Sequence, residues 1–271
     1  MLEMERLESI LRLLKQKQTA SVKVLAERLY TSEATVRRDL NELERQGFIK
    51  RVHGGAVLLD GVTRELPLYV RQHQNSGAKQ IIAERAVRLI HDGQVIFMDA
   101  SSTVMFLIRY LEMFKMLTIV TNGLKTAQEL SSLTHRVYCT GGLLLHNSSA
   151  YVGEYAIDFI RHFNADLFFF SSRGLSEGGQ ITDASGEETC VRRAMFEQSR
   201  RQVFLCDSSK VGKSYCYNLC MLSQIKISIY IMSVERWIFP PVFRYTIVVF
   251  QHRMRKSGNE REVFNTMYLS L

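Results

Sequence analysis

The chain has 271 residues, and its 46% hydrophobic and 23% charged content lies within the range of globular proteins. This composition predicts a packed core, in one large domain or in two ordinary ones. The formal net charge of +8 favours an anionic partner without identifying it. Five scattered cysteines with no C-x-x-C pair argue against a disulfide framework and against a structural zinc site.

Cofactor, metal and membrane signals are missing from the sequence. The seven histidines are dispersed and form no H-E-x-x-H motif, so we expect no metal, no cofactor and no catalytic residues. The first residues form a Glu-rich amphipathic pattern instead of a secretory leader. No run of about 18 uncharged apolar residues occurs, so we expect no membrane span and a cytoplasmic location.

The N-terminal segment has the spacing of three helices. Apolar residues between positions 7 and 14 recur at helical spacing and predict a first amphipathic helix of about fifteen residues. A second, short helix carries Val24, Leu25 and Leu29. A third helix follows Ser32, which is placed to cap it, and buries a stripe of apolar residues at positions 36, 40 and 43. We expect Gly47 to end this helix.

The third helix turns a polar face away from its apolar stripe. A predicted strand and wing with basic tips follows over residues 48–55. Outward arginines are common on helices that are only solvated, so the short second helix, the tight turn and the basic wing are what favour DNA. We expect Asp39 to orient a neighbouring arginine instead of touching DNA. The expected DNA contacts are Ser32, Thr35, Arg37, Arg38, Asn41, Arg51 and His53.

The run S-E-A-T-V-R-R-D-L-N-E-L-E-R-Q-G-F-I-K-R-V-H-G-G-A resembles the signature of the DeoR family of bacterial transcriptional regulators. The T-V-R-R-D-L core, followed by a glycine and then H-G-G-A, is highly specific to that family. The resemblance implies a winged helix-turn-helix domain, which we place at residues 1–58.

A linker and a larger α/β domain are expected next. Residues 59–78 contain glycines and a proline without sustained periodicity, and we interpret them as a hinge. From residue 79 to residue 225, helix patterns alternate with near-continuous apolar strands, which predicts a parallel sheet covered on both faces. The five strands are centred on residues 95–98, 117–120, 136–139, 167–170 and 203–206.

Small polar residues follow these strands. Ligands bind beyond the carboxyl ends of strands in open parallel sheets. Ser101, Ser102 and Thr103 would lie at a helix N-terminus that favours an anion, and Lys210 would add a positive charge. Asp99 and Asn122 could bond sugar hydroxyls, so the set suits a small polyol phosphate. The same residue types are also ordinary turn formers.

The strand-end motifs D-A-S-S-T, T-N-G, G-G and D-S-S-K-V-G resemble those of the DeoR effector domain. That domain resembles the ribose-phosphate isomerase and CoA-transferase-like fold, and its usual effector is a phosphorylated sugar. The resemblance implies phosphate binding by residues 101–103 and Lys210, and hydroxyl recognition by Asp99 and Asn122. It also implies close backbone approach at Gly142 and Gly153.

The resemblance covers about residues 5–225. Relatives continue with an acidic strand of I-D-x-x-I-T-D type, a final helix and a strand, whereas this chain has an apolar segment, two adjacent prolines and a basic end. We therefore expect residues 226–271 to be an atypical tail, from an altered reading frame or a divergent C-terminus. Such a tail would lack the final helix and leave the edge of the sheet incomplete.

Together these features predict a homo-oligomeric DNA-binding regulator, a repressor of a carbohydrate-utilisation operon that a phosphorylated sugar releases from its operator. One alternative is a sugar-phosphate isomerase-like enzyme with an N-terminal extension, which would need a catalytic carboxylate such as Asp99. A second alternative is a non-functional remnant with an altered C-terminus.

Overall fold

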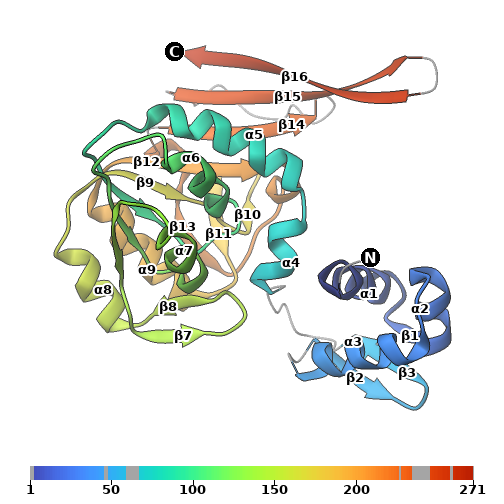
Figure 1. Ribbon diagram of the computed structural model, residues 1–271. Helices are drawn as coiled ribbons and strands as arrows, with labels where there is room; N and C mark the ends of the chain where they lie inside the picture. The colour runs from blue at the N-terminus through green and yellow to red at the C-terminus, as the bar shows by residue number, and fades with distance from the viewer. Residues whose placement is uncertain are drawn as a thin grey trace. The chain divides into compact units, whose positions relative to one another are not determined.

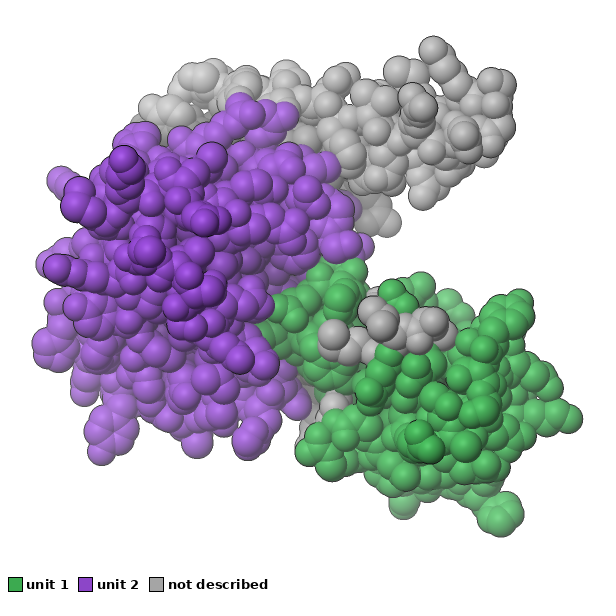
Figure 2. All heavy atoms as spheres, viewed as in Figure 1, with its two compact units in different colours: residues 1–74 green, residues 75–271 purple. Residues whose placement is uncertain are grey.

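The computed structural model describes residues 3–45, 48–58, 67–225, 227–233, 245–256 and 259–270. The chain divides into two compact units, residues 1–74 and residues 75–271, which Figure 2 shows in different colours. Within the described ranges, no helix is long and apolar enough to cross a membrane.

The first unit contains the three predicted helices, α1 (Glu3–Lys17), α2 (Val22–Leu29) and α3 (Glu33–Arg45) (Figure 1). Their apolar stripes meet in one core, in which Leu14, Leu25 and Leu40 are fully buried. Burying each leucine contributes about 1.5–3 kcal/mol, so packing holds the eight-residue α2, which is too short to be stable alone. Gly47, the predicted end of α3, lies outside the described residues.

The predicted wing is an antiparallel hairpin of β2 (Ile49–Val52) and β3 (Gly55–Leu58). A strand that the sequence did not reveal, β1 (Thr19–Ser21), pairs with the free side of β3. The two glycines of the H-G-G motif are required for different structural reasons. Gly54 takes a φ of +76° in the hairpin turn, and a Cβ on Gly55 would lie 2.4 Å from the carbonyl oxygen of Ala20 in β1.

The two units join inside the predicted linker. Residues 59–66 lie outside the described residues, but α4 (Leu68–His73) and the start of α5 (Ser76–Ala86) occupy positions where we expected an irregular hinge. Val70 of α4 is buried in the core of the first unit. A six-residue helix with few apolar positions is too short to give a visible helical period, which is why the sequence analysis missed it.

The second unit is built on a mainly parallel sheet of eight strands. All five predicted strands are present and parallel, in the order β12-β9-β4-β5-β6. Their bounds are β4 (Val95–Met98), β5 (Thr118–Thr121), β6 (Arg136–Cys139), β9 (Ala165–Phe170) and β12 (Ser199–Asp207). The predicted parallel α/β architecture is confirmed.

The C-terminal segment differs from the expected irregular tail. β14 (Ile227–Ser233) pairs in parallel with β12, β15 (Tyr245–Lys256) pairs in parallel with β14, and β16 (Asn259–Ser270) returns antiparallel. The sheet is therefore extended beyond β12 instead of ending there (Figure 1). The apolar run that begins at Ile227 lies beside Val203 of β12 in the pairing register, which explains why this segment is a strand.

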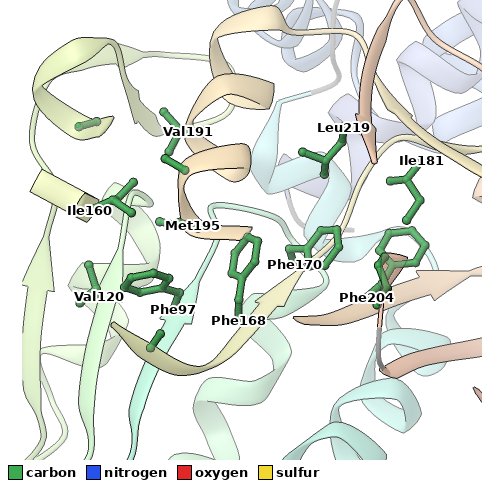
Figure 3. Packing of buried hydrophobic residues seen from close by; sticks show 14 of the residues in the cluster. Phe97, Val120, Ile160, Phe168, Phe170, Ile181, Val191, Met195, Phe204 and Leu219 are labelled. Carbon is green, nitrogen blue, oxygen red and sulfur yellow. The ribbon is translucent and has the colours of Figure 1, made fainter. Parts of the chain in front are cut away.

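Helices cover both faces of the sheet. On one face, α8 (Glu154–Arg161) and α9 (Gly186–Glu197) pack on alternate strand residues, including Phe168 and Phe170, whose rings stack with centroids 4.9 Å apart (Figure 3). By strand alternation Phe169 points to the opposite face. There α5 contacts β12, β14 and η2 (Val104–Leu107).

The remaining described elements are short helices and the strands of two small antiparallel sheets. They are η1 (Val87–Leu89), α6 (Ile108–Leu111), α7 (Leu124–Leu130), β7 (Leu143–Leu145), β8 (Ala150–Val152), β10 (Gly174–Leu175), β11 (Gln180–Asp183), η3 (Ser208–Lys210), β13 (Tyr217–Met221) and η4 (Leu222–Gln224).

Candidate DNA-binding surface and effector site

The start of α3 is fixed by its own polar residues. The Ser32 hydroxyl accepts a hydrogen bond from the Thr35 backbone N–H at 3.2 Å, so the predicted N-cap is confirmed. The Ser32 and Thr35 hydroxyl oxygens also lie 2.9 Å apart. This arrangement holds the first turn of α3 while leaving Ser32 exposed.

The three arginines proposed for DNA differ in what holds them. Arg37 is exposed and donates to the Glu33 carboxylate at 2.6 Å, one turn earlier on the helix. Arg38 is exposed and makes no hydrogen bond or ion pair with any described residue. Arg51, in β2, donates to the Asn41 side-chain oxygen, and its backbone N–H donates to Glu44 at 2.7 Å. Asn41 and Arg51 therefore fix the wing to α3.

His53 lies in the turn between β2 and β3 and is exposed. The polar face of α3 and the tip of the wing thus form one exposed surface within the first unit, joined by the bond between Asn41 and Arg51.

Asp39 has a different partner from the one we expected. It is 2% exposed and accepts two hydrogen bonds from Arg6 of α1, from Nε at 2.8 Å and from Nη2 at 3.1 Å. These hydrogen bonds raise the pKa of Arg6, although burial opposes the rise. Asp39 therefore orients an arginine of another helix and joins α3 to α1. The separation of 33 residues hides this pair from any local sequence pattern.

The second unit brings the ends of three neighbouring strands together around Lys210. Its ammonium group donates to the Ser171 hydroxyl at 2.6 Å, after β9, and to the Thr103 hydroxyl at 3.2 Å, after β4. It also lies 3.8 Å from the Asp207 carboxylate, at the end of β12. Lys210 and Thr103, which the sequence predicts to share one site, are in contact.

A second lysine, which the sequence analysis missed, reaches the same loop. Lys79 of α5 is 3% exposed, and its ammonium group donates to the Ser102 hydroxyl at 3.1 Å. It is hard to find from sequence because it lies in a helix that precedes the first strand. The two ammonium groups therefore engage adjacent hydroxyls of the loop after β4.

The pKa of Asp207 is lowered by the positive charges of this site. Burial alone would raise the pKa of its carboxyl group, but the charge of Lys210, hydrogen bonds from Ser209 and the charge of Lys79 outweigh burial and lower the pKa. The chain has thus placed two cations beside one carboxylate at the carboxyl edge of the sheet, an arrangement that attracts anions.

Asp99 and Ser101 make hydrogen bonds within and between the strand-end loops. Asp99 is fully buried, and its carboxylate accepts from the Ser101 N–H at 3.0 Å, from the Ser171 N–H at 3.2 Å and from Arg192 Nε at 2.9 Å. The Ser101 hydroxyl accepts from the Val104 N–H at 3.3 Å and so caps η2. In this geometry Asp99 holds the loops after β4 and β9 together, which differs from the expected contact with a ligand hydroxyl.

Arg192 of α9 was also missed by the sequence analysis. Besides Asp99, it donates to Asp183 at 2.8 Å and to Glu188 at 2.8 Å, and its own side chain is 5% exposed. One guanidinium group therefore fixes β4, β11 and α9 relative to one another. Its partners lie up to 93 residues away, so no spacing in the sequence reveals them.

Asn122, after β5, keeps an acceptor that nothing in the described structure uses. Its amide nitrogen donates to the Tyr151 carbonyl at 3.1 Å, whereas its side-chain oxygen is buried without a hydrogen-bond partner among the described residues. A buried carbonyl without a donor costs about 1–3 kcal/mol. A ligand hydroxyl is one group that would satisfy it.

Gly142 and Gly153 both require the backbone freedom of glycine, with φ of +109° and +91°. A Cβ on Gly142 would lie 2.6 Å from the carbonyl oxygen of Val152, so the close approach at Gly142 is to β8. Gly153 precedes α8 and has open space around its Cβ position. In the described part of the chain, no group of three or more His, Cys, Asp or Glu side chains could hold a metal ion.

Two family models match the chain, and together they cover both units. The DeoR-like helix-turn-helix domain matches residues 6–62, and the DeoR C terminal sensor domain matches residues 74–230. The chain belongs to the DeoR family. The sensor-domain match ends inside β14, so β15 and β16 lie beyond it.

Several DeoR-family relatives align over most of their length. The HTH-type transcriptional regulator GlpR of Haloferax volcanii is 35% identical over 229 residues, which cover 84% of this chain and 90% of that protein. GolR of Listeria innocua is 37% identical over 213 residues, covering 78% and 84%. The lactose phosphotransferase system repressor of Staphylococcus aureus is 32% identical over 225 residues, covering 82% and 89%.

Among solved structures, the chain is similar to ribose 5-phosphate isomerase A from Methanocaldococcus jannaschii. The TM-score is 0.39 at 17% identity, and the match covers 51% of this chain and 55% of the isomerase.

These comparisons identify the chain as a DNA-binding transcriptional regulator, not an enzyme. The isomerase alternative is not favoured, because the relatives that align over most of the chain are named regulators and repressors. Asp99, the carboxylate that such an enzyme would need, is also fully engaged by Ser101, Ser171 and Arg192.

Proposed function

We propose that this DeoR-family regulator is a homo-oligomeric repressor of a carbohydrate-utilisation operon, and that a phosphorylated sugar bound in its second unit releases it from operator DNA. It acts in the cytoplasm. The names of its relatives support this reading, since one is a lactose phosphotransferase system repressor and another is the transcriptional repressor AccR.

The observation that carries the effector proposal is the pair of lysines at the carboxyl edge of the sheet. Lys79 and Lys210 donate to the hydroxyls of Ser102 and Thr103, which a phosphate could replace or join as a bonding partner. A phosphate group carries a charge of about −1.5 to −2 near neutral pH, and ammonium groups and hydroxyls are its usual protein partners.

The sugar part of the effector is recognised one strand further along the sheet. β5 lies next to β4, so Asn122 follows the strand that neighbours the phosphate loop. Its unpartnered side-chain oxygen accepts a hydrogen bond from a sugar hydroxyl. The effector is therefore a small molecule that has both a phosphate and at least one hydroxyl group.

The DNA is read by the exposed face of α3 together with the wing. Arg38 has the most freedom to reach a base edge or a phosphate, because it makes no hydrogen bond or ion pair with any described residue. Arg37, Ser32 and Thr35 contact the backbone or bases nearby, and Asn41 and Arg51 position the wing. A homo-oligomer presents several such units to repeated half-sites.

The test is genome-wide capture of DNA by the purified full chain, followed by gel-shift titration of the recovered operator at fixed salt. A panel of glycerol 3-phosphate, ribose 5-phosphate, fructose 1-phosphate and the corresponding free sugars is then added. We expect one phosphate to release the operator and its free sugar to have no effect. Salt-insensitive binding, or release by a free sugar as well as by its phosphate, contradicts the proposal.

A further inference from the structure

Asn75 occupies the point where the second unit begins. The boundary between the units falls between Gln74 and Asn75, and only Gln74 separates the end of α4 from Asn75. α4 belongs to the first unit, because Val70 is buried in the core of that unit. Asn75 is therefore joined to α4 of the first unit through a single residue.

The side chain of Asn75 is not used for capping α5. Asparagine is among the best N-cap residues, yet Asn75 makes no capping hydrogen bond to the helix that it precedes. Instead its amide donates to the Asp207 carboxylate at 3.1 Å. Its backbone has a φ of +53°, in the left-handed region that glycine adopts most readily and asparagine more readily than most other residues. The position of the Asn75 side chain is therefore explained by its hydrogen bond to Asp207 at the end of β12, and not by capping of α5.

One turn later, Lys79 ties α5 to a second strand-end loop. Its ammonium group donates to Ser102 in the loop after β4. The start of α5 is thus tied to two loops that carry proposed phosphate contacts. Lys79 bonds Ser102 in the loop after β4, and Asn75 bonds Asp207, which lies three residues before Lys210.

A bound phosphate would compete with these ties. Asp207 has Lys210 at 3.8 Å and also interacts with the charge of Lys79. A phosphate dianion attracts the same two ammonium groups and repels the Asp207 carboxylate. Its arrival changes the balance of forces on both hydrogen bonds at the start of α5.

We propose that Asn75 and Lys79 form the relay that passes occupancy of the effector site to the DNA-binding unit. This inference rests on the proposed function, since it takes a phosphate as the ligand of the site. In this relay, phosphate draws Lys79 away from Ser102 and repels Asp207 from Asn75, and the first turn of α5 and the attached α4 move in response.

Hydrogen–deuterium exchange of the full chain tests the relay, with inorganic phosphate as the probe and its binding followed separately by calorimetry. In the wild type, we expect saturating phosphate to change the exchange rates of amides in residues 68–82 by about fivefold or more. Asn75→Gly keeps the left-handed backbone without strain and removes only the tie to Asp207. We expect this variant to bind phosphate within about twofold of the wild-type affinity, while the exchange response of α4 is lost.

Gln80→Ala is the matched control, because Gln80 is an exposed residue of α5 that bonds Glu84 on the same helix. It should respond as the wild type does. If phosphate binds but residues 68–82 do not respond, or if Asn75→Gly responds fully, the relay is overturned and the phosphate site stands. If phosphate does not bind the wild type at all, the proposed effector site fails, and the relay fails with it.

Discussion

Single residues on α3 divide into those that build the DNA-binding surface and those that are available to use it. Asp39 accepts hydrogen bonds from Arg6, and the side-chain oxygen of Asn41 accepts one from Arg51. Arg37 is held by a salt bridge in which both side chains are about half exposed, a type of pair that is worth at most about 1 kcal/mol and is readily exchanged for a phosphate contact. Arg38 is bonded to no described residue, so no such bond has to break before its side chain reaches DNA.

We therefore expect Arg38→Ala to weaken operator binding by about 1–3 kcal/mol without changing effector affinity. If Arg38 contacts a base, the salt dependence of binding stays the same, whereas a phosphate contact lowers its slope by about one unit. Gel shifts at several salt concentrations separate the two cases. Arg161→Ala, which removes an exposed arginine of the second unit, is the control and should bind as the wild type does. Equal affinities of the Arg38 variant and this control would exclude the assigned face of α3.

Lys210 is the residue on which the phosphate proposal depends most directly. Lys210→Met keeps most of the length of the side chain and removes its ammonium group, so we expect effector affinity to fall about tenfold or more, in line with the value of a charged hydrogen bond. Operator binding should persist and become insensitive to the effector. Calorimetric titration with inorganic phosphate measures the loss. Lys125→Met, an exposed lysine of α7 that bonds Gln128, should leave the affinity unchanged.

At the scale of elements, α3 is held in place by an ion pair with α1. Asp39 is buried with two hydrogen bonds from Arg6, so removing Arg6 leaves a carboxylate without its partner. Arg37 and Glu33 form a chemically similar pair on the exposed side of α3. The two pairs differ in burial, in the number of hydrogen bonds and in whether they join two helices, so the comparison sets a buried tie between helices against an exposed pair within one helix.

We expect Arg6→Met to reduce the free energy of unfolding of the first unit by about 2–3 kcal/mol. Arg37→Met should change it by less than about 1 kcal/mol. Urea denaturation followed by the helical circular dichroism signal compares the two variants in the full chain. Losses of similar size would show that the pair between α1 and α3 is not the main constraint on α3.

The junction of β12 and η3 gives a pH dependence through Asp207. Its pKa is lowered in the folded protein, so its stabilising contribution is complete above the unfolded value of about 3.9 and is lost as the pH falls through the folded value. We expect Asp207→Asn to lose this part of the acid sensitivity. Scanning calorimetry at pH 7 and at several values below pH 4 should show a smaller fall in Tm for the variant. A fall as large as that of the wild type would mean that Asp207 is not a source of acid sensitivity.

The elements that sequence predicted well are those with a local signal. The stripe at Val36, Leu40 and Leu43 repeats every three or four residues, and the apolar strands of the sheet are nearly continuous runs. The missed features depend on contacts between distant residues. Arg6 of α1 meets Asp39 of α3, and Arg192 of α9 meets Asp99, which lies 93 residues earlier in the sequence.

The candidate site divides in the same way. Ser102, Thr103 and Lys210 could be predicted because each follows a strand, and parallel strands bring such residues to one edge. Lys79 could not be predicted, because its helix precedes the sheet and only the packing of α5 brings it to Ser102. Asp99 was found at the right place, but its burial and its three donors could not be read from its position in the sequence.

At the scale of the whole molecule, the proposed effector contacts are confined to α5 and one part of the sheet. The proposed effector contacts follow β4, β5, β9 and β12 or lie on α5, whereas β15 and β16 lie beyond β14 on the far side of β12. The sensor-domain family match likewise ends at residue 230. β15 and β16 therefore extend the sheet on the side away from the proposed site.

If one equilibrium links the two units, the effect of the effector on DNA must be matched by an effect of DNA on the effector. Thermodynamic linkage requires the two factors to be equal, and typical couplings are about 5–150-fold. We therefore expect saturation of the chain with operator duplex to weaken binding of the releasing sugar phosphate by the factor by which that phosphate weakens operator binding. Calorimetric titration of the sugar phosphate into the chain, with and without operator, measures the first factor, and gel shifts measure the second. A sugar phosphate that releases DNA but binds equally well in both titrations would have to act by another route than the site around Lys210.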